Sequence, residues 1–370
     1  MRRKLLPGLA ISLATALCSC GTSTGAAPQQ VALGAVTSVT PSATGVPNAV
    51  ATVGSYEFVS VQGTGQIFTY NVSTGAQVFA SVYATPCKDP SGMVVTAIGG
   101  VNVLAVVCYD TGSLVTLTIN GDGSLTALGS VGGLGTPYPG TALSGTDVLI
   151  PIFGKNLVSN GGVAKVSIAT PAAPAITGMT TLASPVAGGY ANPGFVTLAN
   201  GYIYVAAGSE SLPVDQSSTI QVVNEATMTL VGSPLTVAHS PQQIAVANGV
   251  AFVTFYDAAQ LESIDVSNPA SMKVLGVAPL TASGSAGGSS TGAAACNAIP
   301  VAMIGTNLYA GCYDQATVQR LDVSDPTAIK VLQNVSGIVN PQRLVVDGAA
   351  LLVPSAQAGG AVYRIGLGAP

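Results

Sequence analysis

The sequence predicts an all-β protein, a seven-bladed β-propeller of four-stranded antiparallel blades. Two observations lead to this prediction. Short runs rich in Val, Ile, Leu and Ala alternate with turns rich in Gly, Pro, Ser and Thr, whereas no segment keeps the 3.6-residue apolar period of an amphipathic helix. This strand-and-turn pattern also repeats at intervals close to the roughly 40–50 residues of a four-stranded propeller blade.

A tyrosine–aspartate pair marks the repeated unit. It occurs three times, each time directly after a predicted strand, as Tyr109-Asp110, Tyr256-Asp257 and Tyr313-Asp314. Each pair precedes a polar turn and an alternating strand, such as 317–323, and then a fourth short strand, such as 329–332. The unit is therefore four antiparallel strands.

The blades are counted by their opening strands, which usually follow or contain a proline. These prolines are Pro47, Pro90, Pro139, Pro193, Pro241, Pro300 and Pro341. The spacing between successive members of this series stays close to the repeat length of propeller blades. Seven blades are therefore expected.

The last predicted blade has room for only three strands. The short segment from Pro341 to the end of the chain contains strands at 343–346, 350–353 and 361–365. The apolar segment 30–39 has no partner of its own, so we expect it to supply the outer strand and close the ring, which hides exposed sheet edges. The alternative is six complete blades with an irregular terminal hairpin.

Four cysteines lie beyond the N-terminal segment, and an even number in an exported chain indicates disulfides before metal ligands or a nucleophile. Cys87 lies close to Cys108 in the sequence, and Cys296 lies similarly close to Cys312. Each pair brackets a predicted β-hairpin, so we expect the disulfides Cys87–Cys108 and Cys296–Cys312. The turn of the second hairpin is expected to place Cys312 opposite Pro300.

The first twenty residues have the layout of a secretory signal, because a positively charged start precedes a short apolar stretch and small polar residues. Leu17-Cys18-Ser19-Cys20 also resembles a bacterial lipobox. We expect residues 1–20 to be a lipoprotein signal peptide with Cys20 acylated, residues 21–29 a flexible tether, and residues 30–370 a single propeller domain. The alternative is an ordinary secretion signal that ends in two stray cysteines. No later apolar stretch reaches the about 20 residues of a spanning helix, so membrane contact is expected only through the anchor.

Charged side chains are unusually few. Lys and Arg number 11 and Asp and Glu 15, together 7% of 370 residues, against roughly 25% in an ordinary soluble domain. Removal of Arg2, Arg3 and Lys4 with the signal would leave 8 basic side chains and a net charge of −7, which argues against a nucleic-acid partner. Two explanations stay open. One is an acid-exposed periplasm or cell surface, where few charges mean little self-repulsion, and the other is a secretome biased toward Ala, Gly and Thr.

Two segments resemble a known group of proteins. Residues 321–326 (LDVSDP) and 264–269 (IDVSNP), with a weaker echo at 166–171, look like the LVIVD and YVTN-type repeats of bacterial cell-surface propellers. The resemblance implies an exported seven-bladed ring, often without assigned chemistry. Some lactonase-type enzymes are similar in shape, so the fold does not give the function.

Few residues point to chemistry. The chain has no Trp, which removes the Trp-containing repeats of quinoprotein dehydrogenases, sialidases and WD proteins. His239 is the only histidine, and no haem-attachment motif, Gly-x-Ser-x-Gly elbow or Asp-rich calcium loop occurs. We therefore assign no catalytic residue, no metal ligand and no cofactor.

A candidate binding face is expected around one mouth of the channel, because the loop entering each inner strand and the turn after the second strand open on the same side. Its residues are Tyr109, Asp110, Tyr256, Asp257, Tyr313, Asp314 and His239. Aromatic rings with hydroxyls suit a neutral polar ligand or a protein loop better than phosphate. A plainer interpretation also stays open, in which each Asp stabilises its own turn and each Tyr packs between blades. Segment 281–295 is either a lid on this face or a slack connection.

Two functional hypotheses follow. The favoured one is a non-enzymatic envelope lipoprotein, a monomeric ring anchored in the periplasm or at the outer-membrane surface that offers this face to an envelope protein or a neutral polymer. The competing one is a lactonase-like or other hydrolase that uses the channel mouth, with or without a metal. The scarcity of His and Glu disfavours the hydrolase.

Overall fold

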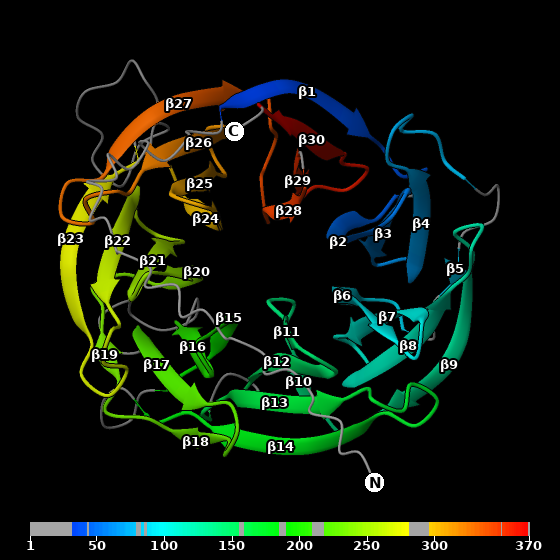
Figure 1. Ribbon diagram of the computed structural model, residues 1–370, viewed down its shortest axis with the longest axis horizontal. Helices are drawn as coiled ribbons and strands as arrows, with labels where there is room; N and C mark the ends of the chain where they lie inside the picture. Colours follow the sequence, from blue (N-terminus) through cyan, green and yellow to red (C-terminus); the bar gives the residue numbers. More distant parts are fainter. Residues whose placement is uncertain are drawn as a thin grey trace, which may run out of the picture.

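Seven antiparallel sheets surround a central axis (Figure 1). This computed structural model describes residues 32–42, 44–78, 83–84, 87–154, 159–184, 190–208, 218–280, 296–348 and 350–368. Within these ranges the chain contains strands and turns and no α-helix, and no helix long and apolar enough to cross a membrane is found. The predicted seven-bladed propeller is confirmed, and the six-bladed alternative is wrong.

The blades follow the chain around the ring, with the first strand of each nearest the axis. Blade 1 contains β2 (Val46–Val53), β3 (Tyr56–Gln62), β4 (Gln66–Asn71) and β5 (Tyr83–Ala84). Blade 2 contains β6 (Pro90–Ile98), β7 (Val101–Cys108), β8 (Ser113–Ile119) and β9 (Leu125–Val131). Blade 3 contains β10 (Thr136–Pro137), β11 (Ala142–Ser144), β12 (Asp147–Phe153), β13 (Gly162–Ser167) and β14 (Ala175–Thr181).

The remaining blades repeat this order. Blade 4 contains β15 (Pro193–Ala199), β16 (Tyr202–Ala207), β17 (Thr219–Asn224), β18 (Thr229–Leu230) and β19 (Leu235–Thr236). Blade 5 contains β20 (Pro241–Ala247), β21 (Val250–Phe255), β22 (Gln260–Asp265) and β23 (Lys273–Pro279). Blade 6 contains β24 (Ala298–Ile304), β25 (Asn307–Cys312), β26 (Thr317–Asp322) and β27 (Lys330–Ser336). Blade 7 contains β28 (Val345–Asp347), β29 (Ala350–Pro354), β30 (Val362–Leu367) and β1 (Leu33–Val39).

The N-terminal strand closes the ring, as predicted. Figure 1 shows β1 beside β30. The two strands pair antiparallel, with Val36 opposite Ile365. A side chain of blade 6 also holds the start of β1, because Gln333 accepts a bond from the Leu33 N–H at 2.9 Å and donates one to the Leu33 carbonyl at 2.8 Å. Blade 7 is thus built from both ends of the described chain, which leaves β30 without a free edge.

A register shift in the inner strands corrects one expectation. Ile304 lies opposite Asn307, so the turn contains two residues and is not centred on Thr306. Between Ala298 and Val301 two residues of β24 also oppose one residue of β25, and together these put Cys312 opposite Ala298 and not opposite Pro300. Similar shifts begin at the prolines that open blades 1, 2, 4 and 5. Proline cannot donate a ladder hydrogen bond, and a bulge accommodates it at the start of a strand.

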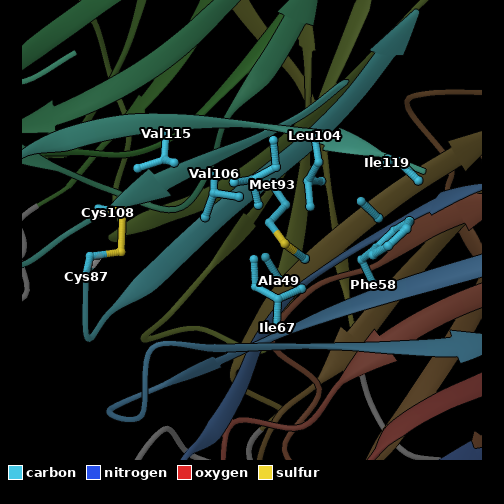
Figure 2. Packing of buried hydrophobic residues seen from close by; sticks show 12 residues of the cluster. Ala49, Phe58, Ile67, Cys87, Met93, Leu104, Val106, Cys108, Val115 and Ile119 are labelled. Carbon is cyan, nitrogen blue, oxygen red and sulfur yellow. A yellow bond between two sulfur atoms is a disulfide. The ribbon is translucent and has the colours of Figure 1, made fainter. Parts of the chain in front are cut away.

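The core lies between neighbouring blades. In Figure 2 the side chains of Phe58 and Ile67 from blade 1 face Met93 and Leu104 from blade 2, beside the Cys87–Cys108 disulfide. The same kind of apolar layer, rich in branched side chains, recurs around the ring. Sheet-on-sheet packing of this kind fixes the blade positions and therefore the loops at both ends of the channel.

Candidate functional site

The tyrosine–aspartate pairs lie in three equivalent turns, each after the second strand of its blade. In each turn the tyrosine N–H donates to a carbonyl of the segment that enters the inner strand of the same blade. These bonds are Tyr109 N–H to Asp89 at 3.0 Å, Tyr256 N–H to Ser240 at 2.9 Å and Tyr313 N–H to Asn297 at 2.9 Å. All three turns therefore lie at the end of the ring where the inner strands begin, here called the entry end.

The three aspartates bind within their own blades. Each carboxylate accepts a hydrogen bond from the segment entering its own inner strand. The bonds join Asp110 to the N–H groups of Lys88 (3.0 Å) and Asp89 (3.3 Å), Asp257 to the N–H of Ser240 (2.8 Å), and Asp314 to the side-chain amide of Asn297. A side-chain acceptor of this kind holds a turn in shape, so these carboxylates stabilise the fold of the entry end.

Tyr109 packs between blades. Its ring meets the edge of the Tyr138 ring at a centroid distance of 6.3 Å, and Tyr138 stacks on Phe153 at 4.1 Å. Aromatic pairs in such geometries stabilise a contact beyond the area they bury. Tyr109 therefore joins blade 2 to blade 3, as the plainer interpretation expects.

Tyr256 and Tyr313 form the aromatic part of the entry end, here called the tyrosine patch. Tyr256 is 44% exposed, whereas the Tyr313 hydroxyl donates to the Ala356 carbonyl at 3.5 Å. Burial raises the pKa of Tyr313, and Tyr256 and Asp314 raise it further. The two tyrosines occupy equivalent turns, after β21 in blade 5 and after β25 in the neighbouring blade 6.

His239 occupies the place of a half-cystine. The strand registers put His239 and Phe255 in blade 5 where Cys296 and Cys312 lie in blade 6. The His239 ring meets the Phe255 ring edge-on at a centroid distance of 5.8 Å, and its Nδ1 lies 3.4 Å from an Asp257 oxygen. Blade 5 thus uses a ring contact where blade 6 uses a covalent bond.

Both predicted disulfides are present. Cys87 bonds to Cys108 with a Cα–Cα distance of 5.7 Å, and Cys296 bonds to Cys312 with a distance of 4.8 Å. All four half-cystines are buried. Each bond ties the last residue of a second strand to the segment entering its inner strand, so both lie at the entry end.

Glu262 is a buried acid near His239 that the sequence prediction omits. It lies on β22, is 5% exposed, and its Oε1 accepts a bond from Gln260 at 3.2 Å while its Oε2 has no described partner. Burial raises the pKa of Glu262, and the nearby His239 lowers it. His239, Asp257 and Glu262 are thus three ionisable side chains of blade 5 near the entry end.

A cavity of about 190 Å³ lies on the axis, and all seven blades line it. Apolar side chains such as Val50, Met93 and Val301 form part of its wall, and Gln243 adds an amide. Arg343, from the segment that precedes β28, is the one charged side chain among the described residues that line it. Arg343 is 8% exposed, and burial lowers its pKa to about 9.

Arg343 was absent from the sequence prediction, although a signal for it existed. Of the eight basic side chains that follow the signal segment, Arg343 is the one that falls within a predicted inner strand, at 343–346. The described residues contain no cluster of three His, Cys, Asp or Glu side chains that could hold a metal ion. Cys20 and the segment 281–295 lie outside the described residues.

The architecture defines the class of protein, a seven-bladed β-propeller, and comparisons with solved structures agree. Similar structures include "Kuenenia stuttgartiensis Hydrazine Synthase" (14% identity, TM-score 0.67, 88% of this chain and 96% of that one) and virginiamycin B lyase from Staphylococcus aureus (12%, 0.62, 91% and 99%). A third is the periplasmic gluconolactonase of Pseudomonas aeruginosa (14%, 0.60, 91% and 98%). No protein-family model and no curated protein matches the chain. At these identities the likeness shows the fold alone, so the LVIVD and YVTN resemblance stays a prediction.

Proposed function

We propose that the chain is an exported, lipid-anchored β-propeller of the bacterial cell envelope, and that its entry end is a non-enzymatic binding face. Two buried disulfides support an oxidising compartment. The secretory layout of the first twenty residues and the lipobox-like sequence at Cys20 support export and anchoring. A periplasmic protein among the similar structures agrees with this location.

The observation that carries the binding role is the exposure of Tyr256 on a rigid turn. Its backbone is bonded to the segment entering β20, the next residue, Asp257, is fixed by the Ser240 N–H, and yet 44% of the Tyr256 residue surface is open. A large amphipathic ring held in place loses little conformational freedom when a partner covers it. Its hydroxyl and apolar face suit a neutral polar partner, an envelope protein or an uncharged polymer.

Affinity capture from cross-linked envelopes tests this role. Wild-type protein is expected to retain a partner. The Tyr256→Ala variant is expected to retain at least about tenfold less of it, because the loss of a central aromatic contact weakens binding by this amount. Val101→Ala is the matched control, because Val101 is also 44% exposed but lies at the opposite end of the ring. Equal capture by all three proteins would contradict the proposal.

A second candidate function, a hydrolase at the channel mouth, rests on the His239–Asp257 pair. Nδ1 of His239 and Oδ2 of Asp257 are 3.4 Å apart, and an oriented imidazole is a general base in many hydrolases. Lactone hydrolysis that is lost in His239→Gln, or a stoichiometric divalent ion in the purified protein, would favour this candidate over the binding module.

We also propose that the envelope in which this ring works is acidic. The low charge content supports this, and so do Glu57 and Glu262, two buried carboxyl groups whose pKa values burial raises. A carboxyl group that is neutral at the working pH is buried at less cost than an ion. Loss of structure on acidification to about pH 3, below the usual carboxyl range, would contradict an acidic habitat.

A further inference from the structure

The cavity on the channel axis contains a positive charge that none of the described carboxylates neutralises. The Arg343 side chain lines it and is more than nine-tenths buried. Among the described residues no carboxylate lies within 4.0 Å of the guanidinium, whereas Lys165 has one such neighbour and Arg364 has two. A buried cation without a counter-charge is costly, so the site favours an anion from outside the chain.

Hydrogen bonds hold the Arg343 guanidinium in place and leave some of its N–H donors unused. Nη1 donates to the Pro139 carbonyl at 2.9 Å, and Nη2 donates to the Asn48 side-chain oxygen at 3.0 Å. The central carbon (Cζ) of the Arg343 guanidinium lies 5.7 Å from the centre of the Phe195 ring, a distance at which the ring face stabilises a cation. Nε is buried and has no hydrogen-bond partner among the residues that the structure describes. Two of five N–H groups are therefore used, and Nε–H is among those left.

The interrupted inner strand of blade 3 makes this arrangement possible. Between β10 and β11 the chain leaves the ladder, and the Pro139 carbonyl is available to Arg343. Gly140 next to it lies so close to blade 4 that an added Cβ would collide with the Phe195 ring. The close approach that Gly140 permits brings Phe195 and the Pro139 carbonyl to the same guanidinium.

We propose that the axial cavity binds a small organic carboxylate, with Arg343 as its charged anchor. A guanidinium presents parallel N–H donors that match the two oxygens of a carboxylate. The apolar wall formed by Val50, Met93 and Val301 suits a short hydrocarbon body. The volume of about 190 Å³ far exceeds the roughly 10–15 Å³ that one water needs.

Other anions fit this site less well. A phosphate dianion would bring a second negative charge that no further cation in the lining matches. Chloride is a single acceptor atom, so it does not match the two parallel N–H donors of a guanidinium as the two oxygens of a carboxylate do. The inference concerns the axial cavity and is independent of the proposed docking role of the tyrosine patch.

Thermal unfolding of the full-length, disulfide-bonded protein tests the inference, because a ligand that binds the folded state raises Tm in a saturable way. Propionate is the probe, propionamide is its neutral isostere, and chloride and inorganic phosphate are compared at equal ionic strength. Propionate alone is expected to raise Tm with saturation. No shift, or an equal shift with propionamide, chloride or phosphate, would overturn the assignment.

Two variants locate the effect. Arg343→Gln removes the charge and is expected to weaken propionate binding at least about tenfold, the usual loss for a charged hydrogen-bond donor. Lys273→Gln removes one exposed positive charge far from the axis and is expected to leave binding unchanged. Equal weakening in both variants, or in neither, would overturn the role of Arg343. Should Arg343→Gln fail to fold, the comparison of the four probes on the wild-type protein still decides.

Discussion

Arg364 and Glu57 form an ion pair across the seam where the ring closes. Nη2 of Arg364, on β30, lies 2.5 Å from Oε2 of Glu57, on β3, although 307 residues separate them. Nη1 of Arg364 also lies 3.5 Å from Asp347. The Glu57 side chain is 3% exposed. Burial raises the pKa of Glu57, and this effect exceeds the lowering caused by Arg364.

Arg364→Met is expected to destabilise the protein mainly at neutral pH. It leaves Glu57 buried and ionised without a cation, which typically costs about 3 kcal/mol. At about pH 4 Glu57 is protonated in the variant, so the deficit is expected to shrink. Urea unfolding at both pH values measures the difference. The control is the double variant Arg364→Met/Glu57→Gln, which should regain most of the lost stability at neutral pH. If Arg364→Met alone is as stable as the wild-type protein at neutral pH, the prediction is wrong.

The pH dependence of stability is expected to reach its maximum in mild acid. Burial raises the pKa values of Glu57 and Glu262 above 4.5. Their contribution to the free energy of unfolding is therefore complete below pH 4.5 and is lost as the pH rises through the higher folded-state pKa values. Four aspartates that begin turns act in the opposite direction, because bonds from neighbouring hydroxyl and N–H groups lower their pKa values below 3.8. These residues are Asp122, Asp265, Asp322 and Asp325.

The aspartate contribution is complete above 3.8 and is lost only as the pH falls through the lowered values. Both groups therefore stabilise the fold between about pH 4 and 4.5, where Tm should exceed its value at neutral pH. In Glu57→Gln/Glu262→Gln, whose amides mimic the protonated acids, the decline toward neutral pH should be smaller. A wild-type Tm that rises steadily from about pH 4 to neutral would count against this assignment.

The repeat predicts the ring but not the contacts between its blades. The opening prolines and the orphan N-terminal segment are enough to predict seven blades and the closure by β1, because both are local patterns. An alternation pattern shows neither the two-residue turn between Ile304 and Asn307 nor the bulge after Ala298. Each shifts the register by one residue, so the predicted partner of Cys312 is two residues from the true one. Arg343, Glu262 and the Glu57–Arg364 pair depend on which blade faces a side chain, and a single sequence does not contain that information.

Loss of one disulfide is expected to leave the ring folded but less stable. Cys296→Ala/Cys312→Ala opens a loop of 16 residues, for which loop-closure entropy predicts a loss of about 3 kcal/mol. Denaturant unfolding of oxidised protein measures it. Reduction of the wild-type protein should produce a larger loss, since it opens both disulfides. A double variant that unfolds with wild-type stability would mean that the bond adds nothing to a blade already fixed by its neighbours.

The equivalence of His239 and Phe255 with the half-cystines of blade 6 predicts a third disulfide. The register at the start of β20 matches that of β24, where the corresponding Cα atoms are 4.8 Å apart, within the range for an unstrained bond. His239→Cys/Phe255→Cys should therefore oxidise spontaneously and show no free thiol by thiol titration. Its stability should rise little, since losing the buried Phe255 ring costs about 3 kcal/mol or more and offsets the cross-link. Phe255→Cys alone is the control, and after unfolding it should show a reactive thiol. Two free thiols in the double variant would refute the equivalence of His239 and Phe255 with Cys296 and Cys312.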